Sequence, residues 1–269
     1  MKQTPSLSLT RTTRLYLAPG SPVPAKSKNS YASFSTTRGL GAFYEIVLHC
    51  DGPAEETTGF VESIYDMDQA VHAVMAPRIA TALHEGCDHP AHILEESLPE
   101  LQARISARIR RVDWNLMPTY RMSMKTDDLK TYLLSQQYQF AASHRLHNPE
   151  FDEQKNRDVF GKCCNPNGHG HNYRLEVEIR VPIDSSQPGY GFTVLDLDRV
   201  VHDRIIDEYD HTYLNMDVDD FAKSNPTVEN ITLNCHQRLV DPLSEHGIRL
   251  NKVRLWETEK TCCVFPADT

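Results

Sequence analysis

The chain has 269 residues, of which 39% are hydrophobic and 24% charged, and its formal net charge is −9. This composition supports a buried core, and the length suits two domains of about 100–150 residues. No apolar run approaches the roughly 18 residues of a membrane-spanning helix, and the negative charge argues against a broad nucleic-acid-binding surface. We therefore expect a protein that binds neither a membrane nor nucleic acid.

The N-terminal residues and the cysteines bear on where the protein works. No Asp or Glu occurs before Glu45, whereas the same stretch carries several Lys and Arg residues among Ser, Thr and Pro. We interpret residues 1–28 as an N-terminal tail that includes a first strand, with loop-forming residues over 18–30. Seven cysteines without a secretory signal indicate free thiols in a reducing compartment, and we expect a cytoplasmic protein. The basic, acid-free start also fits an organellar transit peptide.

Two parts of the chain repeat each other at an offset of ~130 residues, which indicates a duplicated domain. Gly39–Tyr44 leads into a strand-like segment over 45–49, and Gly168–Tyr173 leads into an alternating strand over 174–181. The later elements are predicted as helices over 69–83 and 91–109 and a closing strand over 119–125 in the first copy, and as helices over 199–209 and 227–243 and strands over 252–257 and 262–266 in the second.

Each copy therefore contains strands, then two helices, then strands again. The strands alternate apolar and polar residues, which is typical of an antiparallel sheet with helices on one face. The sequence predicts an α+β protein with one domain over residues 29–130 and a second over 131–269, each built on a four-stranded antiparallel sheet.

A histidine cluster in the second copy has the pattern of a metal site. Alternate residues of a strand share a face, so His169 and His171 would present two imidazoles to one side, with Gly170 between them. His144, on the preceding predicted strand, is a candidate third ligand. Three histidines with an open fourth position are a catalytic zinc arrangement, whereas Mg²⁺ would favour carboxylates.

Other interpretations of these residues stay open at this point. The histidines could be two exposed loop residues and one core residue, and Cys163 and Cys164 could contribute soft ligands to a structural site. The first copy has Leu40 and Ala42 at the positions of His169 and His171, so a similar strand forms there without a histidine. That asymmetry favours the metal interpretation.

Several separated segments of the second half occur in the order found in one enzyme family. These are Ala142–Leu146, Phe160–Tyr173, Leu195–Leu197, Tyr209–His211, Leu214–Asn215, Pro226–Asn230 and Trp256–Thr258. Together they resemble the 6-pyruvoyl-tetrahydropterin synthases over residues 135–266, about half of the chain. The resemblance implies two tandem T-fold (tunnelling-fold) domains, of which the first is a degenerate copy without a metal site.

The resemblance also implies roles for individual residues. Zinc would be held by His144, His169 and His171, and a cysteine acts as general base, which falls on Cys163 rather than its neighbour Cys164. The catalytic Asp–His pair and the carboxylate and polar residues of the pterin pocket fall on Asp210, His211, Thr227, Glu229 and Glu257. A metal and a cationic imidazole near the thiol would lower the pKa of Cys163. The substrate implied is 7,8-dihydroneopterin triphosphate, which loses triphosphate.

Competing functions and assemblies follow from the same residues. The C-x5-H-G-H spacing resembles the pyruvoyl-forming branch, and the alternative is a 6-carboxytetrahydropterin synthase of queuosine biosynthesis. A non-catalytic pterin or purine binder is the third interpretation. Because the family joins sheets of several subunits into a barrel, we expect a homo-oligomer, first a trimer of tandem chains. The counterpart of Glu257 in the first copy is placed at about Met124, so no complete site is expected within residues 30–128.

Overall fold

The computed structural model describes residues 5–18, 40–87, 89–183 and 192–267. Within it the chain forms two compact units. Unit 1 comprises Met1–Leu134 and Pro182–Gly191, and unit 2 comprises Ser135–Val181 and Phe192–Thr269. The fold is α+β with antiparallel strand pairs, as the sequence predicts. Among the described helices, none has the length and apolar character needed to cross a membrane.

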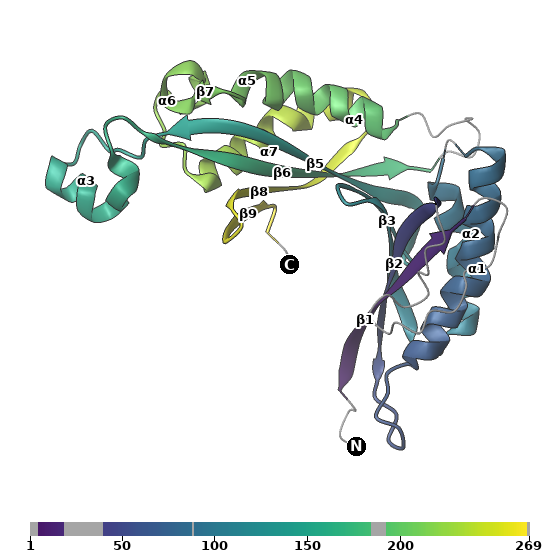
Figure 1. Cartoon of the computed structure of the whole chain (residues 1–269). Coiled ribbons are helices and arrows are strands. Elements are labelled where there is room, and N and C mark those ends of the chain that lie inside the picture. Colours follow the sequence, from purple (N-terminus) through teal and green to yellow (C-terminus); the bar gives the residue numbers. More distant parts are fainter. Residues whose placement is uncertain (1–4, 19–39, 88, 184–191, 268–269) are drawn as a thin grey trace. The chain divides into compact units, whose positions relative to one another are not determined.

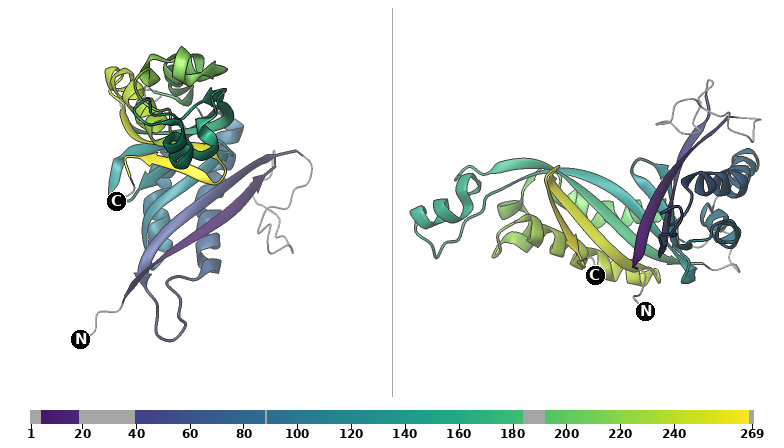
Figure 2. Two further views of the ribbon diagram at one scale, coloured as in Figure 1. Left: turned by 90° about the vertical axis from the view of Figure 1, so that its left-hand side faces the viewer. Right: turned by 90° about the horizontal axis from the view of Figure 1, so that it is seen from below.

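Unit 1 is a sheet covered on one face by two helices, as Figures 1 and 2 show. Its strands follow one another as antiparallel neighbours in the order β1-β2-β3-β4. The elements are β1 (Ser6–Leu17), β2 (Ala42–Pro53), α1 (Ile64–Glu85), α2 (Ala91–Arg104), β3 (Arg108–Met117) and β4 (Tyr120–Lys125). Leu15, Ile46 and Leu48 of the sheet are fully buried, as is Met67 of α1, so the core lies between the sheet and the helices.

Strand β1 lies within the range that the sequence predicts as a tail. It pairs with β2 along its whole length, and its last three residues are buried. Arg11 of β1 also forms a salt bridge at 2.6 Å with the nearly buried Asp68 of α1. Ser6–Leu17 is therefore the first strand expected in the N-terminal stretch, and it is an integral part of the unit 1 sheet, whereas the predicted loop over 18–30 falls almost entirely outside the described residues.

We expect Leu15→Ala to destabilise the protein by about 2–5 kcal/mol, because removing a buried leucine leaves a cavity in the core. Urea unfolding would measure the change. Thr12→Ala is the matched control, because Thr12 lies in the same strand but is exposed, and a shift within about 0.5 kcal/mol is expected. Equal, negligible effects of both changes would contradict a structural role for β1.

The third strand of unit 1 is β3, whose first two residues lie within the predicted helix over 91–109. The predicted helix over 91–109 ends at Arg104, because Ile105 adopts an extended conformation. The segment predicted as the first closing strand is β4, the fourth strand. Met124, the residue predicted as the counterpart of Glu257, lies on β4 and is fully buried.

Unit 2 contains residues 135–144 of β5 (Asp128–His144), followed in the sheet by β6 (His169–Pro182), β8 (Arg249–Thr258) and β9 (Thr261–Phe265). The short β7 (Thr212–Tyr213) pairs with β5 in the parallel sense. Its helical elements are α3 (Glu153–Phe160), η1 (Gly161–Cys164), α4 (Val194–Val201), η2 (His202–Ile206), α5 (Asp207–Tyr209), α6 (Leu214–Asp217), η3 (Asp219–Phe221) and α7 (Val228–Glu245). As in unit 1, two strands precede and two follow the main helices.

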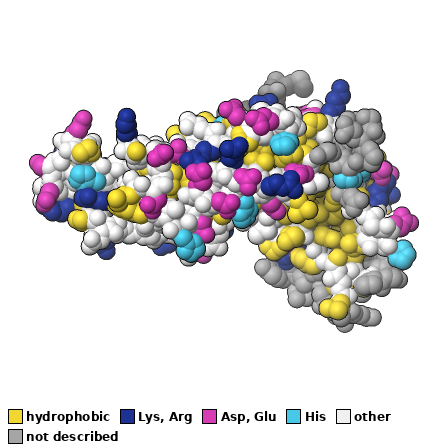
Figure 3. Space-filling model, turned by 90° about the horizontal axis from the view of Figure 1, so that it is seen from above, with side chains coloured by type: hydrophobic (Ala, Val, Ile, Leu, Met, Phe, Trp, Pro, Cys, Tyr) yellow, Lys and Arg dark blue, Asp and Glu magenta, His cyan; other side chains and the backbone are white. Residues whose placement is uncertain are grey.

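Two caps fix where the main helices of unit 2 begin. Thr193 and Asp196 form a reciprocal capping box, so α4 starts five residues before the predicted helix. Thr227 accepts a hydrogen bond from the backbone of Asn230 and so starts α7. The start of α7 lies at the histidine end of the sheet, because the residue before its cap, Pro226, is hydrogen-bonded to His144. On the face shown in Figure 3, acidic and basic side chains are interspersed.

Candidate metal and pterin site

Three histidines converge at one end of the unit 2 sheet. His144 is the last residue of β5, and His169 and His171 open β6, where the alternation of side chains turns both to the face that carries His144. Nε2 of His144 lies 3.1 Å from Nε2 of His169. One ring nitrogen from each histidine lies within 4.8 Å of the others. The structure thus brings together the three residues predicted as metal ligands.

The environment of these rings suits a cation. His144 is fully buried, and this burial lowers its pKa to about 4, so the imidazole is neutral and keeps a lone pair at neutral pH. Burial also lowers the pKa of His171. Within the described part of the chain, Nδ1 of His169 and Nε2 of His171 are buried without a hydrogen-bond partner. Three converging imidazoles are a ligand set that zinc takes in catalytic sites.

Glu257 and Cys163 lie beside the histidines. Oε1 of Glu257, on β8, is 3.6 Å from Nε2 of His144 and 3.8 Å from Nε2 of His171. Cys163 belongs to η1, and the negative charge of Glu257 acts on its thiol. The neighbouring Cys164 is buried and directs its sulfur to the carbonyl of Gly161 at 3.1 Å. Of the two adjacent thiols, Cys163 is the one on which the charge of Glu257 acts.

The protein side chains alone raise the pKa of the Cys163 thiol, whereas the sequence predicts that it is lowered. Burial raises the pKa of Cys163, and the charges of Glu257 and Cys164 raise it further. A lowered pKa therefore requires a positive charge that these side chains do not supply, which a metal ion on the histidines would provide.

The start of α7 adjoins the cluster through its backbone. The carbonyl of Pro226 accepts a hydrogen bond of 2.6 Å from Nδ1 of the buried His144. The next residue, Thr227, caps the helix, and Glu229 stands exposed in the first turn. Thr227 and Glu229, the residues predicted to contact the pterin, thus lie one and three residues after Pro226, which contacts the candidate metal ligand His144.

The Asp210–His211 pair lies at the edge of β5. Oδ1 of Asp210 accepts a hydrogen bond of 2.7 Å from the backbone of Ala141, and Oδ2 lies 2.9 Å from Nδ1 of His211. The side chain of His211 is 83% exposed, and its backbone has a φ of 60°. A non-glycine residue in this region is strained, and here the hydrogen bond from its N–H to the carbonyl of Ala141 holds it in place. His211 and His171 both line a surface hollow of about 640 Å³.

Two residues that support the site were not assigned roles from the sequence. The hydroxyl of Tyr173 lies 3.4 Å from Nδ1 of His144, while its ring stacks on Phe140 with centroids 5.0 Å apart. Pro226 contributes only a backbone carbonyl. A backbone acceptor leaves no signal in residue type, whereas the period-2 spacing of Tyr173 after His171 places its side chain on the same strand face.

Gly168 permits the close approach of β6 to β5. Its φ is +69°, and a Cβ at this position would lie 2.9 Å from the carbonyl oxygen of His144. We expect Gly168→Ala to force the two strand ends apart and to weaken zinc binding by about tenfold or more, since ligand spacing sets metal affinity. Competition with a chromophoric chelator would measure the affinity.

Gly161→Ala is the control for backbone strain alone. Gly161 also has a positive φ, of +55°, but nothing lies within 4 Å of the Cβ that a substitution would add. It should lose stability without losing zinc affinity beyond about threefold. Equal loss of affinity in the two variants would show that steric approach at Gly168 is not what sets the ligand spacing.

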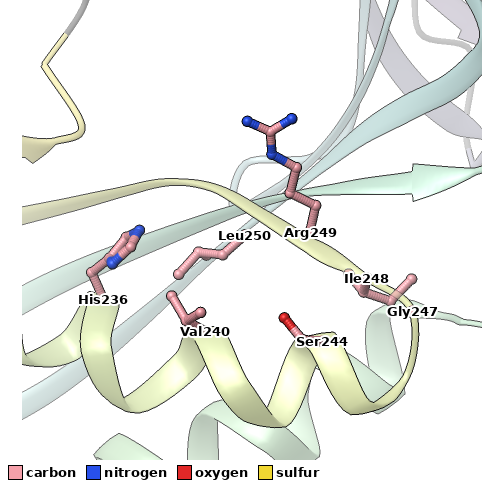
Figure 4. A pocket seen from close by; sticks show the side chains of 7 residues that line it. All are labelled: His236, Val240, Ser244, Gly247, Ile248, Arg249 and Leu250. Atoms are coloured by element: carbon pink, nitrogen blue, oxygen red, sulfur yellow. The ribbon is translucent and has the colours of Figure 1, made fainter.

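A second hollow in unit 2 is lined by residues other than those of the histidine site. It has a volume of about 430 Å³ and lies between α7 and β8, where His236, Val240 and Ser244 form a row facing Leu250 (Figure 4). None of the residues that line it is a predicted site residue. The chemistry-bearing groups gather instead at the histidine end of the sheet.

A protein-family model matches the half of the chain that contains these groups. The family model for 6-pyruvoyl tetrahydropterin synthase matches residues 133–268. The human 6-pyruvoyl tetrahydrobiopterin synthase is 36% identical over 135 residues, covering 50% of this chain and 91% of the relative. The enzyme of that name from Drosophila melanogaster is 35% identical over 127 residues, covering 47% of this chain and 74% of the relative.

A solved structure is similar to about half of the chain. The 6-pyruvoyl tetrahydropterin synthase of Caenorhabditis elegans is 30% identical with a TM-score of 0.47, covering 51% of this chain and 96% of that one. The family model covers the half of the chain that contains the histidine cluster, Cys163 and Glu257. The chain therefore belongs to the 6-pyruvoyl tetrahydropterin synthase family.

Proposed function

We propose that the protein is a zinc-dependent 6-pyruvoyl-tetrahydropterin synthase, a lyase that converts 7,8-dihydroneopterin triphosphate with elimination of triphosphate. The observation that carries this proposal is the convergence of His144, His169 and His171 beside a carboxylate and a thiol, Glu257 and Cys163. A metal set, an acceptor for the pterin and a base are the groups that the reaction needs.

His144, His169 and His171 are proposed to hold the zinc and to leave one position open for the substrate. When bound, the ion polarises hydroxyl or carbonyl groups of the substrate side chain and so acidifies the adjacent C–H bonds. The rearrangement transfers reducing equivalents within the substrate, so it needs no nicotinamide. This agrees with the lack of a G-x-G-x-x-G motif in the sequence.

Cys163 is proposed as the general base and Glu257 as the pterin anchor. The thiol of Cys163 lies close enough to Glu257 for the carboxylate charge to act on it, so one substrate can meet both groups. A carboxylate such as Glu257 can accept paired hydrogen bonds from the aminopyrimidine edge, which fixes the ring relative to the base. Thr227 and Glu229, at the start of α7, are proposed to line the same pocket.

His211, oriented by Asp210, is proposed to shuttle the proton in a site of another subunit. Its imidazole is 83% exposed and reaches outward from the edge of β5, an arrangement that suits contact with a neighbouring chain. This supports a homo-oligomer, and we retain a trimer of chains as the first expectation. Static light scattering would measure the mass, and a stable monomer at working concentration would contradict the shared site.

Unit 1 is proposed to be a degenerate copy of the same fold that has lost the site. It shares the order of two strands, two helices and two strands with unit 2, and the sequence has Leu40 and Ala42 where unit 2 has His169 and His171. In this proposal residues 29–130 serve the assembly and 131–269 serve catalysis. One zinc and one pterin are then expected per chain.

Product analysis tests the proposed function. Zinc-loaded protein incubated with 7,8-dihydroneopterin triphosphate should release triphosphate and form 6-pyruvoyl-tetrahydropterin, identified by mass under anaerobic conditions. A 6-carboxytetrahydropterin product would assign the alternative activity, that of queuosine biosynthesis. Pterin binding without turnover, unchanged in Cys163→Ala, would assign a non-catalytic pterin or purine binder instead.

A further inference from the structure

The loop before α7 holds the ring of His144. Nδ1 of this fully buried histidine lies 2.6 Å from the carbonyl oxygen of Pro226. Because a carbonyl only accepts hydrogen bonds, Nδ1 carries the proton and Nε2 keeps its lone pair. Nε2 is the nitrogen that faces His169. The Pro226 carbonyl thus fixes both the tautomer and the orientation of one candidate metal ligand.

Asn225 in turn fixes this carbonyl by joining two segments of the chain. Its Oδ1 accepts a hydrogen bond of 2.9 Å from the backbone N–H of His147, which follows the end of β5. Its own carbonyl accepts hydrogen bonds from Nδ2 of Asn230 at 2.8 Å and from the backbone of Thr227 at 2.9 Å. Asn225 therefore ties the chain that follows β5 to the start of α7.

We propose that Asn225 is a positioning residue for zinc binding, acting on His144 through the carbonyl of Pro226. The inference rests on the proposed zinc site at the three histidines. Without the side-chain oxygen of Asn225, the loop loses its attachment to His147, and the Pro226 carbonyl is free to leave Nδ1 of His144. The ring can then rotate or change tautomer, and its Nε2 is no longer held toward the metal position. Loss of an outer partner of this kind typically weakens metal binding by about 10–100-fold.

Asn215 offers a matched control at the same strand end. Its Oδ1 accepts a hydrogen bond of 2.7 Å from the backbone N–H of Arg145, and its Nδ2 donates one of 2.9 Å to the carbonyl of Arg145. It clamps the chain directly after His144, just as Asn225 clamps it three residues after. Asn215 makes no hydrogen bond to the loop that carries Pro226. Removing the Asn215 side chain therefore tests whether loosening the end of β5 is by itself enough to weaken zinc binding.

The experiment measures zinc affinity by chelator competition for wild type, Asn225→Ala, Asn225→Asp and Asn215→Ala. Circular dichroism and thermal unfolding of the zinc-free proteins establish that each variant is folded. We expect Asn225→Ala to bind zinc about 10–100-fold more weakly. Asn225→Asp should stay within about threefold of wild type, because a carboxylate keeps the acceptor for the His147 N–H. Asn215→Ala should also stay within about threefold, since it leaves the Pro226 carbonyl in place.

Cobalt gives a second readout that a general loss of stability would not move. The visible absorption of Co²⁺ on the three histidines should change in Asn225→Ala and keep the wild-type form in Asn215→Ala. Wild-type zinc affinity in a folded Asn225→Ala protein would overturn the inference, as would an equal loss in Asn215→Ala. Failure of the wild-type chain to bind zinc would instead count against the proposed function itself.

Discussion

Replacing His169 by alanine is expected to remove zinc from the protein and to lower kcat/KM by about two orders of magnitude or more, because the ion supplies the Lewis acid of the proposed reaction. The fold should persist. His169 is only partly buried, and unit 1, whose described residues hold no such histidine cluster, forms the same order of elements. Metal content by elemental analysis, turnover, and unfolding of the same sample would together measure the effect.

His236→Ala provides the matched control for loss of an imidazole. His236 lies on α7, is partly buried, and packs edge-on against Phe265 with ring centroids 4.7 Å apart. It should keep one zinc per chain and near-normal turnover. Full metal content in His169→Ala would remove this residue from the ligand set, and a comparable loss of zinc in His236→Ala would show that the effect is not specific to the cluster.

Mixing two inactive variants is expected to restore activity. Cys163→Ala and His211→Ala should each reduce turnover by about 100–10,000-fold, the range for losing a positioned acid or base. If Cys163 of one chain works with His211 of another, random exchange in an equal mixture leaves about one quarter of the sites with both groups intact, because each of the two chains at a site carries its intact group in about half of the cases. Activity after exchange, compared with each variant alone, would measure this.

The mixture of Cys163→Ala with His169→Ala is the negative control. The ligand set lies within one chain, and the charge of Glu257 beside it acts on Cys163 of that chain, so no exchange of subunits can bring an intact thiol and an intact ligand set together. It should remain inactive. No recovery in the Cys163→Ala and His211→Ala mixture, with exchange demonstrated by tagged subunits, would place both groups in one site of the same chain.

The histidine cluster of the candidate site could be predicted from the sequence because it depends on the alternation of side chains along a strand. His169 and His171 share a face since they are two residues apart on a strand, and the strand that precedes them ends at His144. The proximity of Glu257 depends on β8 pairing beside β6, which spacing alone does not predict. The acceptor on Pro226 and the exposure of His211 depend on loop conformations that no residue pattern specifies.

The order of helices and strands could be predicted from the sequence, whereas the residues at which they begin and end were predicted less well. The alternation over Arg108–Met117 is masked by its arginines, and the preceding Leu, Gln and Ala residues favour a helix, so the predicted second helix of the first copy ran into β3. A first strand was expected among residues 1–28, but the bounds of β1 could not be predicted, because a stretch rich in Ser, Thr and Arg shows no clear alternation until its partner strand is known. Tertiary pairing decided both cases.

The division of the chain into units has a practical consequence for dissecting the protein. Residues 128–134 of β5 belong to unit 1 and residues 135–144 to unit 2, so one continuous strand is shared by the two units. A fragment cut at residue 131 would begin inside this strand and would lose part of it. Expression of either half as a separate protein thus calls for a redesigned strand at the cut.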